Sequence, residues 1–178
     1  MRKVVLKMSM SLDGYVGTPS GEVEWIFRSF DDELTTYMVE LLWQAGTHIM
    51  GRVPYQDMAA HWPSSTEPYA PPMNEIPKVV VSRTPFRAEW AGTTVATGDL
   101  TEEIARLKRQ PGKDILAHGG AGFARALSEH RLIDEYRLFV HPIVLGRGLP
   151  IFGDMMDLRL RETRTFPGGA VALTYEPA

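Results

Sequence analysis

The chain has 178 residues, a length that predicts one domain, spanning 1–178, with a single hydrophobic core. Its formal net charge of −3 gives no bulk attraction to nucleic acid or to an anionic membrane, so neither is expected as a partner. Cysteine is absent, which excludes disulfides, cysteine nucleophiles and thiolate metal sites. No apolar run approaches the roughly 20 residues that a membrane-spanning helix needs, and the N-terminal stretch is too polar for a signal peptide, so we expect a cytoplasmic protein.

The first third of the chain shows the patterns of a strand, a helix and a second strand. The β-rich run 4–10 predicts the first strand, and a turn at 18–21 follows. A helix is predicted from Asp32 onwards because apolar residues recur there on one face, and Ser29 is the expected capping residue. Gly46 is expected to end this helix before a short strand at 47–50.

The middle of the chain continues the alternation. A short second helix is predicted around Tyr55, Ala59 and Trp62. The segment Pro63–Pro77 contains five prolines and is predicted to be a loop. Further along, the patterns predict strands at 78–82 and 93–96, a helix at 101–108 that begins near Thr101, and a strand at 114–118.

The last third changes from alternation to consecutive strands. Glycines at 119, 120 and 122 separate a strand from a helix that runs to about Glu129. Strands are then predicted at 136–141, 158–166 and 170–175, the last two joined by a tight turn at Gly168-Gly169. The order predicts a three-layer α/β fold: a mostly parallel central sheet, helices on both faces and a C-terminal antiparallel hairpin.

Three of the predicted strands end in polar or glycine-rich turns, at 50–52, 81–84 and 117–120. Ligands of open parallel sheets bind beyond the carboxyl ends of the strands, which share one edge. Arg52 and Arg83 would lie there beside a glycine-rich helix start, and both features suit phosphate. We therefore expect a ligand with more than one phosphate group. The alternatives are that the glycines serve only a tight turn, that Arg52 is an exposed surface residue, and that Arg83 pairs with Glu89.

Several segments, in order along the chain, resemble the dihydrofolate reductase superfamily, and most closely its branch related to the riboflavin-biosynthesis reductase, the RibD C-terminal domain. The matching segments are Ser11–Val16 (SLDGYV), Ile49–Tyr55 (IMGRVPY), Val79–Thr84 (VVVSRT), Gly119–Phe123 (GGAGF), Leu132–Leu138 (LIDEYRL), Pro142–Gly148 (PIVLGRG) and Leu149–Phe152 (LPIF).

The resemblance implies an NADPH-dependent reductase that acts on a small heterocyclic substrate, pterin- or pyrimidinone-like. It assigns 52 and 82–84 to the adenosine 2′-phosphate, 119–123 to the pyrophosphate, and 8, 16 and 17 to the nicotinamide. The full set of cofactor contacts expected is Met8, Val16, Gly17, Gly51, Arg52, Tyr55, Ser82, Arg83, Thr84, His118, Gly119, Gly120, Ala121, Gly122 and Phe123. For His118, which precedes the glycines, a packed and hydrogen-bonded histidine is the alternative.

Dihydrofolate reductases carry an acid on the first helix that faces the pterin, and the resemblance implies Asp31 as the catalytic residue here. Asp31 is three residues before Leu34 and seven before Met38, which predicts that it faces inward. Glu33 is the second choice. The alternative is that the acids at 31–33 only complement the helix dipole. The proline-tryptophan pair of folate enzymes is missing, so strict dihydrofolate reduction is not expected.

Three expectations remain open at this stage. Asp13 either turns toward the substrate or serves the Asp-Gly turn. The histidines show no metal-ligand spacing, so no metal is expected. The apolar C-terminal strands suggest a homodimer. The functional alternatives are a nucleotide-binding protein of the same fold without catalysis, and a structural α/β domain that binds no nucleotide.

Overall fold

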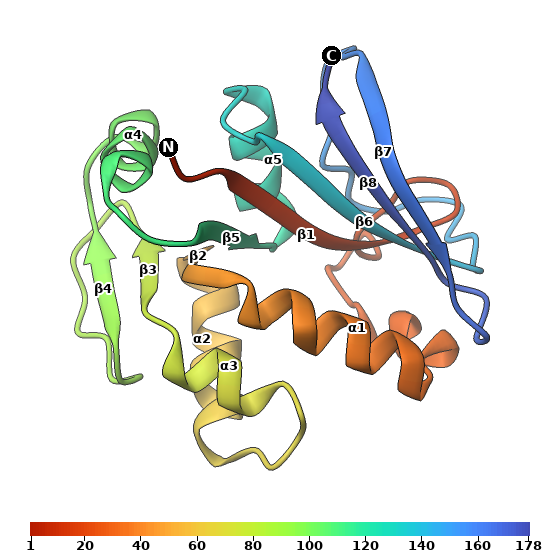
Figure 1. Ribbon diagram of the computed structural model, residues 1–178, viewed down its shortest axis with the longest axis horizontal. Helices are drawn as coiled ribbons and strands as arrows, with labels where there is room; N and C mark the ends of the chain where they lie inside the picture. Colours follow the sequence, from red (N-terminus) through yellow and green to blue (C-terminus); the bar gives the residue numbers. More distant parts are fainter.

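The computed structural model describes residues 1–178, and its centre is one eight-stranded sheet in the order β4-β3-β2-β5-β1-β6-β8-β7 (Figure 1). Strands β1 to β6 run parallel, whereas β8 is antiparallel to both of its neighbours. The strands are β1 (Val4–Ser11), β2 (Ala45–Gly51), β3 (Lys78–Val81), β4 (Thr93–Ala96), β5 (Asp114–His118), β6 (Glu135–His141), β7 (Leu158–Thr165) and β8 (Val171–Pro177). The predicted fold class is confirmed.

Helices cover both faces of the sheet. One face carries α1 (Asp32–Trp43), α2 (Arg52–His61) and α3 (Ala70–Glu75), and the other carries α4 (Leu100–Arg109) and α5 (Ala121–Glu129). Two short 3₁₀ helices, η1 (Glu24–Ser29) and η2 (Trp62–Ser64), complete the set. Alternation along β1 divides the core: Leu6 packs on the α4–α5 side and Val5 on the α1–α3 side. Lys7 lies two residues after Val5, so its side chain points to the same face of the sheet, toward the α1–α3 layer.

Helix starts differ from the sequence-based predictions in two places. Asp31, not Ser29, caps α1, because its carboxylate accepts the Leu34 amide, while the Ser29 hydroxyl contacts His141 Nδ1 at 2.7 Å. Asp99, not Thr101, caps α4 in the same way. In both helices the capping carboxylate satisfies an amide that has no partner within the helix.

Two loops were also predicted incorrectly. Gly46 does not end α1 but lies within β2, where a Cβ would come 2.9 Å from the Lys113 carbonyl oxygen. The proline-rich segment 63–77 is not only a loop, because it contains the end of η2 and all of α3. Its prolines are compatible with α3 because one of them, Pro71, lies in the first helical turn, where no amide donor is required.

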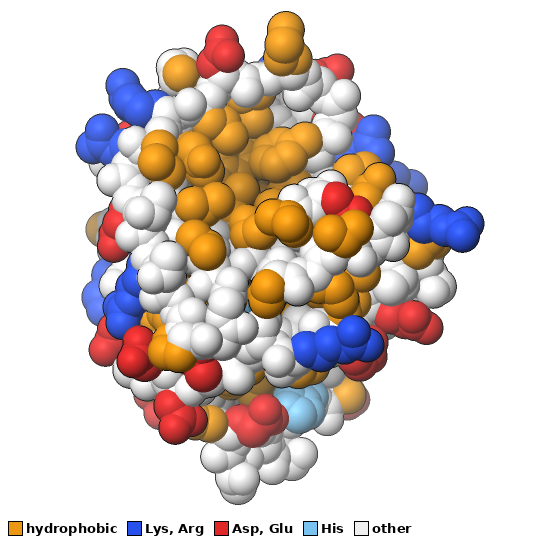
Figure 2. All heavy atoms as spheres, turned by 90° about the vertical axis from the view of Figure 1, so that its right-hand side faces the viewer, with side chains coloured by type: hydrophobic (Ala, Val, Ile, Leu, Met, Phe, Trp, Pro, Cys, Tyr) orange, Lys and Arg blue, Asp and Glu red, His pale blue; other side chains and the backbone are white.

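The face at the C-terminal strands is apolar. Figure 2 shows hydrophobic side chains gathered there around a hollow. Large apolar residues in this part of the chain remain exposed, including Met155 at 94% and Val144 at 63%. The homodimer stays a prediction, and this face is where it would form. None of the helices combines the length and the apolar character that crossing a membrane requires.

Three buried histidines predict that acid destabilises the fold. Burial lowers the pKa of both His48 and His141 to about 4, and it also lowers the pKa of His118. The unfolded chain, with histidine pKa values near 6.5, binds more protons below that pH, so stability is lost as the pH falls from 6.5. Each of His48 and His141 should cost about 2 kcal/mol between pH 7.5 and pH 5.

Urea unfolding across this pH range measures the effect. His141→Asn should reduce the slope of the unfolding free energy against pH, whereas His130→Asn, at an exposed position, should leave it unchanged. A free energy that stays flat between pH 6.5 and pH 5 would contradict the prediction.

Candidate functional site

The three turns that the sequence singled out do lie along one edge of the sheet, at the carboxyl ends of β2, β3 and β5. Two of them touch: Arg52 Nη1 donates to Thr84 Oγ1 at 2.9 Å, and the guanidinium lies over the Phe86 ring at 4.7 Å. The Ser82 hydroxyl donates to the Thr84 carbonyl at 2.7 Å and shapes the same turn. Arg83 is exposed at this edge and pairs with no acid. The edge therefore presents two guanidinium groups to the solvent.

Two helices begin at this edge with no side-chain cap. Gly51 precedes α2 and Gly120 precedes α5, and neither can satisfy the first helical amides. The two starts pack closely, since a Cβ at Gly51 would lie 3.2 Å from Phe123 Cβ and one at Gly120 would lie 3.6 Å from Pro54 Cδ. Two positive helix ends thus converge, an arrangement that suits adjacent phosphate groups.

Glycine at 119 leaves room for the end of the Met8 side chain. A Cβ there would lie 2.3 Å from the sulfur of Met8 on β1, so even alanine would displace Met8. At Gly122, by contrast, a Cβ would meet no atom within 4 Å, so this position is open. Gly17 lies on the far side of β1, where its carbonyl accepts the Leu149 amide at 2.9 Å and ties the loop after β1 to the C-terminal region.

The sheet splits where β5 ends. β1 pairs with β5 only from Val4 to Lys7, and it continues to Ser11 while the chain turns away at Gly119. A cavity of about 170 Å³ opens at the split. It is lined by Lys7, Met8, Ser9, Val16, Val23, Ile26, Met58, His118 and Gly119. The volume holds one ring rather than a dinucleotide, and four of the lining residues are expected cofactor contacts.

Lys7 is a candidate site residue that the sequence analysis missed. Burial lowers the pKa of its ammonium to about 8, and no acid lies near enough to oppose this shift. A detectable signal was present, since Lys7 interrupts the apolar run of a central strand, and lysine is almost never buried without a partner. Alternation along β1 and its pairing with His118 place it at the split in the sheet.

His118 is both a packed histidine and a cavity residue. Its Nε2 lies 2.9 Å from His48 Nδ1, and His48 Nε2 lies 3.0 Å from the Pro72 carbonyl oxygen. Burial, the neighbouring His48 and Lys7 hold the pKa of His118 well below its usual value. The packed, hydrogen-bonded histidine considered from the sequence is therefore present, and the contact of His118 with a cofactor stays a prediction.

Asp31 lies elsewhere. One carboxylate oxygen accepts the Leu34 amide at 2.8 Å and the other accepts the Gly168 amide at 2.7 Å. These two bonds lower the pKa of Asp31, which opposes a role as proton donor at neutral pH. The prediction that Asp31 faces inward from the helix is wrong, because it precedes the helix, caps it and ties it to the β7–β8 turn.

Two other candidates support the scaffold. The Asp13 carboxylate accepts the Ser11 hydroxyl and the amides of Leu145 and Gly146, so it organises the turn after β1. The Tyr55 hydroxyl accepts the Trp90 amide at 3.3 Å, and the tyrosine is buried. Tyr55 therefore anchors α2 rather than pointing out at the phosphate edge.

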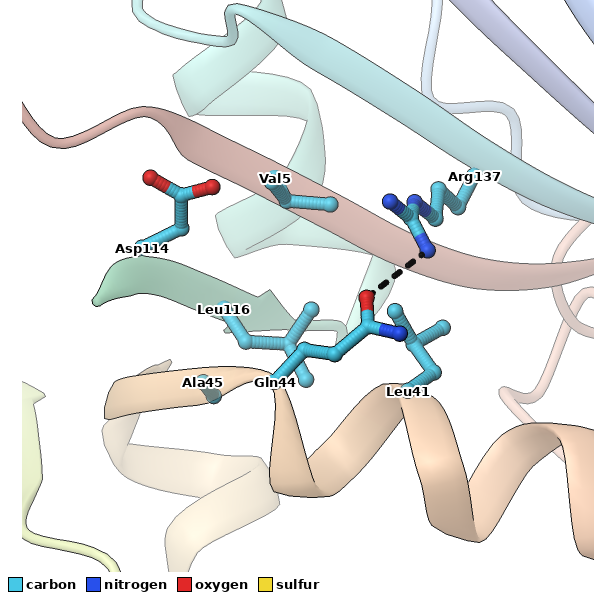
Figure 3. A pocket seen from close by; sticks show the side chains of 7 residues that line it. All are labelled: Val5, Leu41, Gln44, Ala45, Asp114, Leu116 and Arg137. Atoms are coloured by element: carbon cyan, nitrogen blue, oxygen red, sulfur yellow. Dashed lines mark hydrogen bonds between the residues drawn. The ribbon is translucent and has the colours of Figure 1, made fainter.

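A second small cavity lies near the amino ends of β1 and β5 (Figure 3). Its volume of about 20 Å³ admits a single water molecule. Arg137 Nη1 donates to Gln44 Oε1 across it at 3.4 Å. This cavity is at the edge opposite the converging turns, and its size excludes it as a substrate site.

The comparisons with known proteins agree with this geometry. The uncharacterized protein YyaP of Bacillus subtilis (strain 168) is 31% identical over 182 residues, which cover 98% of this chain and 94% of YyaP. The crystal structure of a candidate riboflavin biosynthesis protein from Shewanella sp. PV-4 superposes with a TM-score of 0.80 at 23% identity, covering 100% of this chain and 99% of that one.

A third relative is bifunctional. The diaminohydroxyphosphoribosylaminopyrimidine deaminase/5-amino-6-(5-phosphoribosylamino)uracil reductase of Thermotoga maritima matches with a TM-score of 0.71 at 15% identity, over 99% of this chain and 57% of the longer protein. The profile of the RibD C-terminal domain matches residues 2–172. Sheet order, split and glycine turn thus occur in a chain that belongs to the RibD C-terminal domain family.

Proposed function

We propose that the protein is an NADPH-dependent reductase of a small pyrimidinone-like heterocycle. The observation that carries the proposal is that the two parts of the site adjoin. The cationic edge with its two uncapped helices and the cavity beside Lys7 meet at the carboxyl end of β5. One member of the fold, from Thermotoga maritima, is described as a uracil-derivative reductase, which supports the substrate class. The family supports an oxidoreductase.

The residues at the edge fit the cofactor. Arg52 and the exposed Arg83 would hold the 2′-phosphate, because a guanidinium binds two oxygens at once. The uncapped starts of α2 and α5 would hold the diphosphate. Gly119 lets the chain pass close to Met8, so that a ring can lie against the split. When bound there, the cofactor supplies a hydride.

Reduction of a C=N or C=C bond also needs a proton, and Lys7, which lines the cavity, would provide it. With a pKa of about 8, its ammonium is largely protonated at pH 7 and yet more acidic than an exposed lysine. The basic side chains that interact with Lys7 are His48 and His118, and burial keeps both of these histidines neutral. Val16, Ile26 and Met58 give the cavity an apolar wall, which would strengthen the contact between the ammonium and the substrate.

The cofactor assignment predicts discrimination by charge. The wild-type protein should bind NADPH at least about tenfold more tightly than NADH, since one guanidinium–phosphate contact is worth roughly 1.5 kcal/mol or more. Arg52→Met should remove most of this preference. Arg109→Met, an exposed position on α4, is the matched control and should retain it. Tryptophan fluorescence titration measures the affinities of the three proteins for both nucleotides, and equal affinities in the wild type would refute the assignment.

The proton donor is tested by Lys7→Met. Loss of a general acid should lower NADPH-dependent turnover of a pyrimidinone by about a hundredfold or more, with little change in NADPH affinity. Lys3→Met, next to the same strand but exposed and paired with Glu176, should stay close to wild type. In the wild type, turnover should fall as the pH rises through about 8, because the ammonium then loses its proton. A pH profile that is flat from 7 to 9.5 would exclude Lys7.

The variants Asp31→Asn and Asp31→Ala distinguish a role of Asp31 as the cap of α1 from a role as the catalytic acid. The alanine variant should lower the free energy of unfolding by about 1–2 kcal/mol, the value of a lost cap, while turnover stays close to wild type. Asp32→Asn, at the exposed next position, should change neither quantity. If Asp31→Asn instead abolished turnover at unchanged stability, Asp31 would return as the catalytic acid.

A further inference from the structure

The hydrogen bonds around His118 determine which of its ring nitrogens carries the proton. The Pro72 carbonyl can only accept, so His48 Nε2 must donate to it. In neutral His48 the other nitrogen, Nδ1, then has no proton and accepts from His118 Nε2. Neutral His118 therefore carries its proton on Nε2, and its Nδ1 is a bare acceptor.

His118 Nδ1 remains available for a ligand. It makes no hydrogen bond with the protein, yet it is not among the buried side-chain polar atoms that lack a partner, which are Tyr69 Oη, Thr93 Oγ1 and His141 Nε2. His118 also lines the cavity at the split. The acceptor is therefore reachable from the cavity.

A donor lies beside this acceptor. Lys7 and His118 are direct partners in the parallel pairing of β1 and β5. Partners in adjacent strands project from the same face, with their strands about 4.8 Å apart. The Lys7 ammonium and the bare His118 Nδ1 thus give the cavity one hydrogen-bond donor and one acceptor on neighbouring strands.

We propose that His48 is a positioning residue that holds His118 as a fixed hydrogen-bond acceptor, so that the site selects a ring in which an N–H adjoins a carbonyl or imine. The ring N–H donates a hydrogen bond to His118 Nδ1, and the adjoining carbonyl or imine accepts one from the Lys7 ammonium. An N-alkylated ring would leave His118 Nδ1 unpaired in a largely dry site, which is how hydrogen-bonding sites reject analogues. This selectivity rests on the proposed reductase function, but the tautomer does not.

The first test is a ¹⁵N–¹H long-range NMR spectrum of the histidine rings in the full chain without any ligand. We expect His118 to be protonated at Nε2 alone, and His48→Leu to convert it to a mixture of tautomers. His48→Asn should restore the wild-type form, because its carbonyl oxygen can take the place of His48 Nδ1. A wild-type His118 that is protonated at Nδ1 would overturn the proposal whatever the activity of the protein.

The second test uses uracil and 1,3-dimethyluracil as binding probes. Uracil has N–H groups beside its carbonyls, and the dimethyl derivative has only the carbonyls. The wild type and His48→Asn should bind uracil about tenfold or more tightly than its derivative, and His48→Leu should lose the difference. His130→Asn, exposed and distant, should behave as wild type. Equal affinities in the wild type, or no uracil binding at all, would overturn the selectivity.

These results are separable from the cofactor assignment. Failure of NADPH to bind or react would refute the reductase while leaving the tautomer spectrum and the probe ratio unchanged. Conversely, a reductase that binds uracil and dimethyluracil equally would stand as a reductase without this mode of selection.

Discussion

The parallel pairing of β1 with β5, and its end at Lys7 and His118, is the constraint on which the site depends. Because β5 stops there and β1 continues for four more residues, the sheet has a gap at its centre rather than at its edge. The end of the Met8 side chain lies against Gly119 just beyond the last paired residues. The turn at Gly119-Gly120 also starts α5, so the uncapped start of this helix and the cavity arise from the same turn of the chain.

Charge is distributed unevenly around this gap. Cationic groups and uncapped helix starts lie on the outer edge, where solvent and a charged ligand can reach them. Inside, the histidines are neutral and Lys7 holds its charge at a cost, as its lowered pKa indicates. A half-buried ammonium without an acidic partner is destabilising unless a ligand contacts it, and such groups are typical of functional sites.

The remaining polar side chains near the site have structural partners. Asp31 accepts the amide of Leu34 in its own helix and that of Gly168 in the β7–β8 turn, and Asp13 accepts two amides from the distant segment at 145–146. Their carboxylates were plausible acids on sequence spacing alone. Spacing along a helix, however, cannot show that a residue stands just before the helix and uses both of its oxygens on the backbone.

The sequence by itself determined the alternation of strands and helices, the antiparallel C-terminal hairpin and the meeting of three turns at one edge. These follow from local periodicity and from the rule that parallel strands share their carboxyl ends, so Arg52 and Gly120 could be placed together without coordinates. Only the tertiary structure decided where β5 ends relative to β1, and with it the roles of Lys7, His118 and His48. Their register, burial and hydrogen-bond partners involve residues up to 111 positions apart in sequence, and no local pattern encodes contacts between segments so distant.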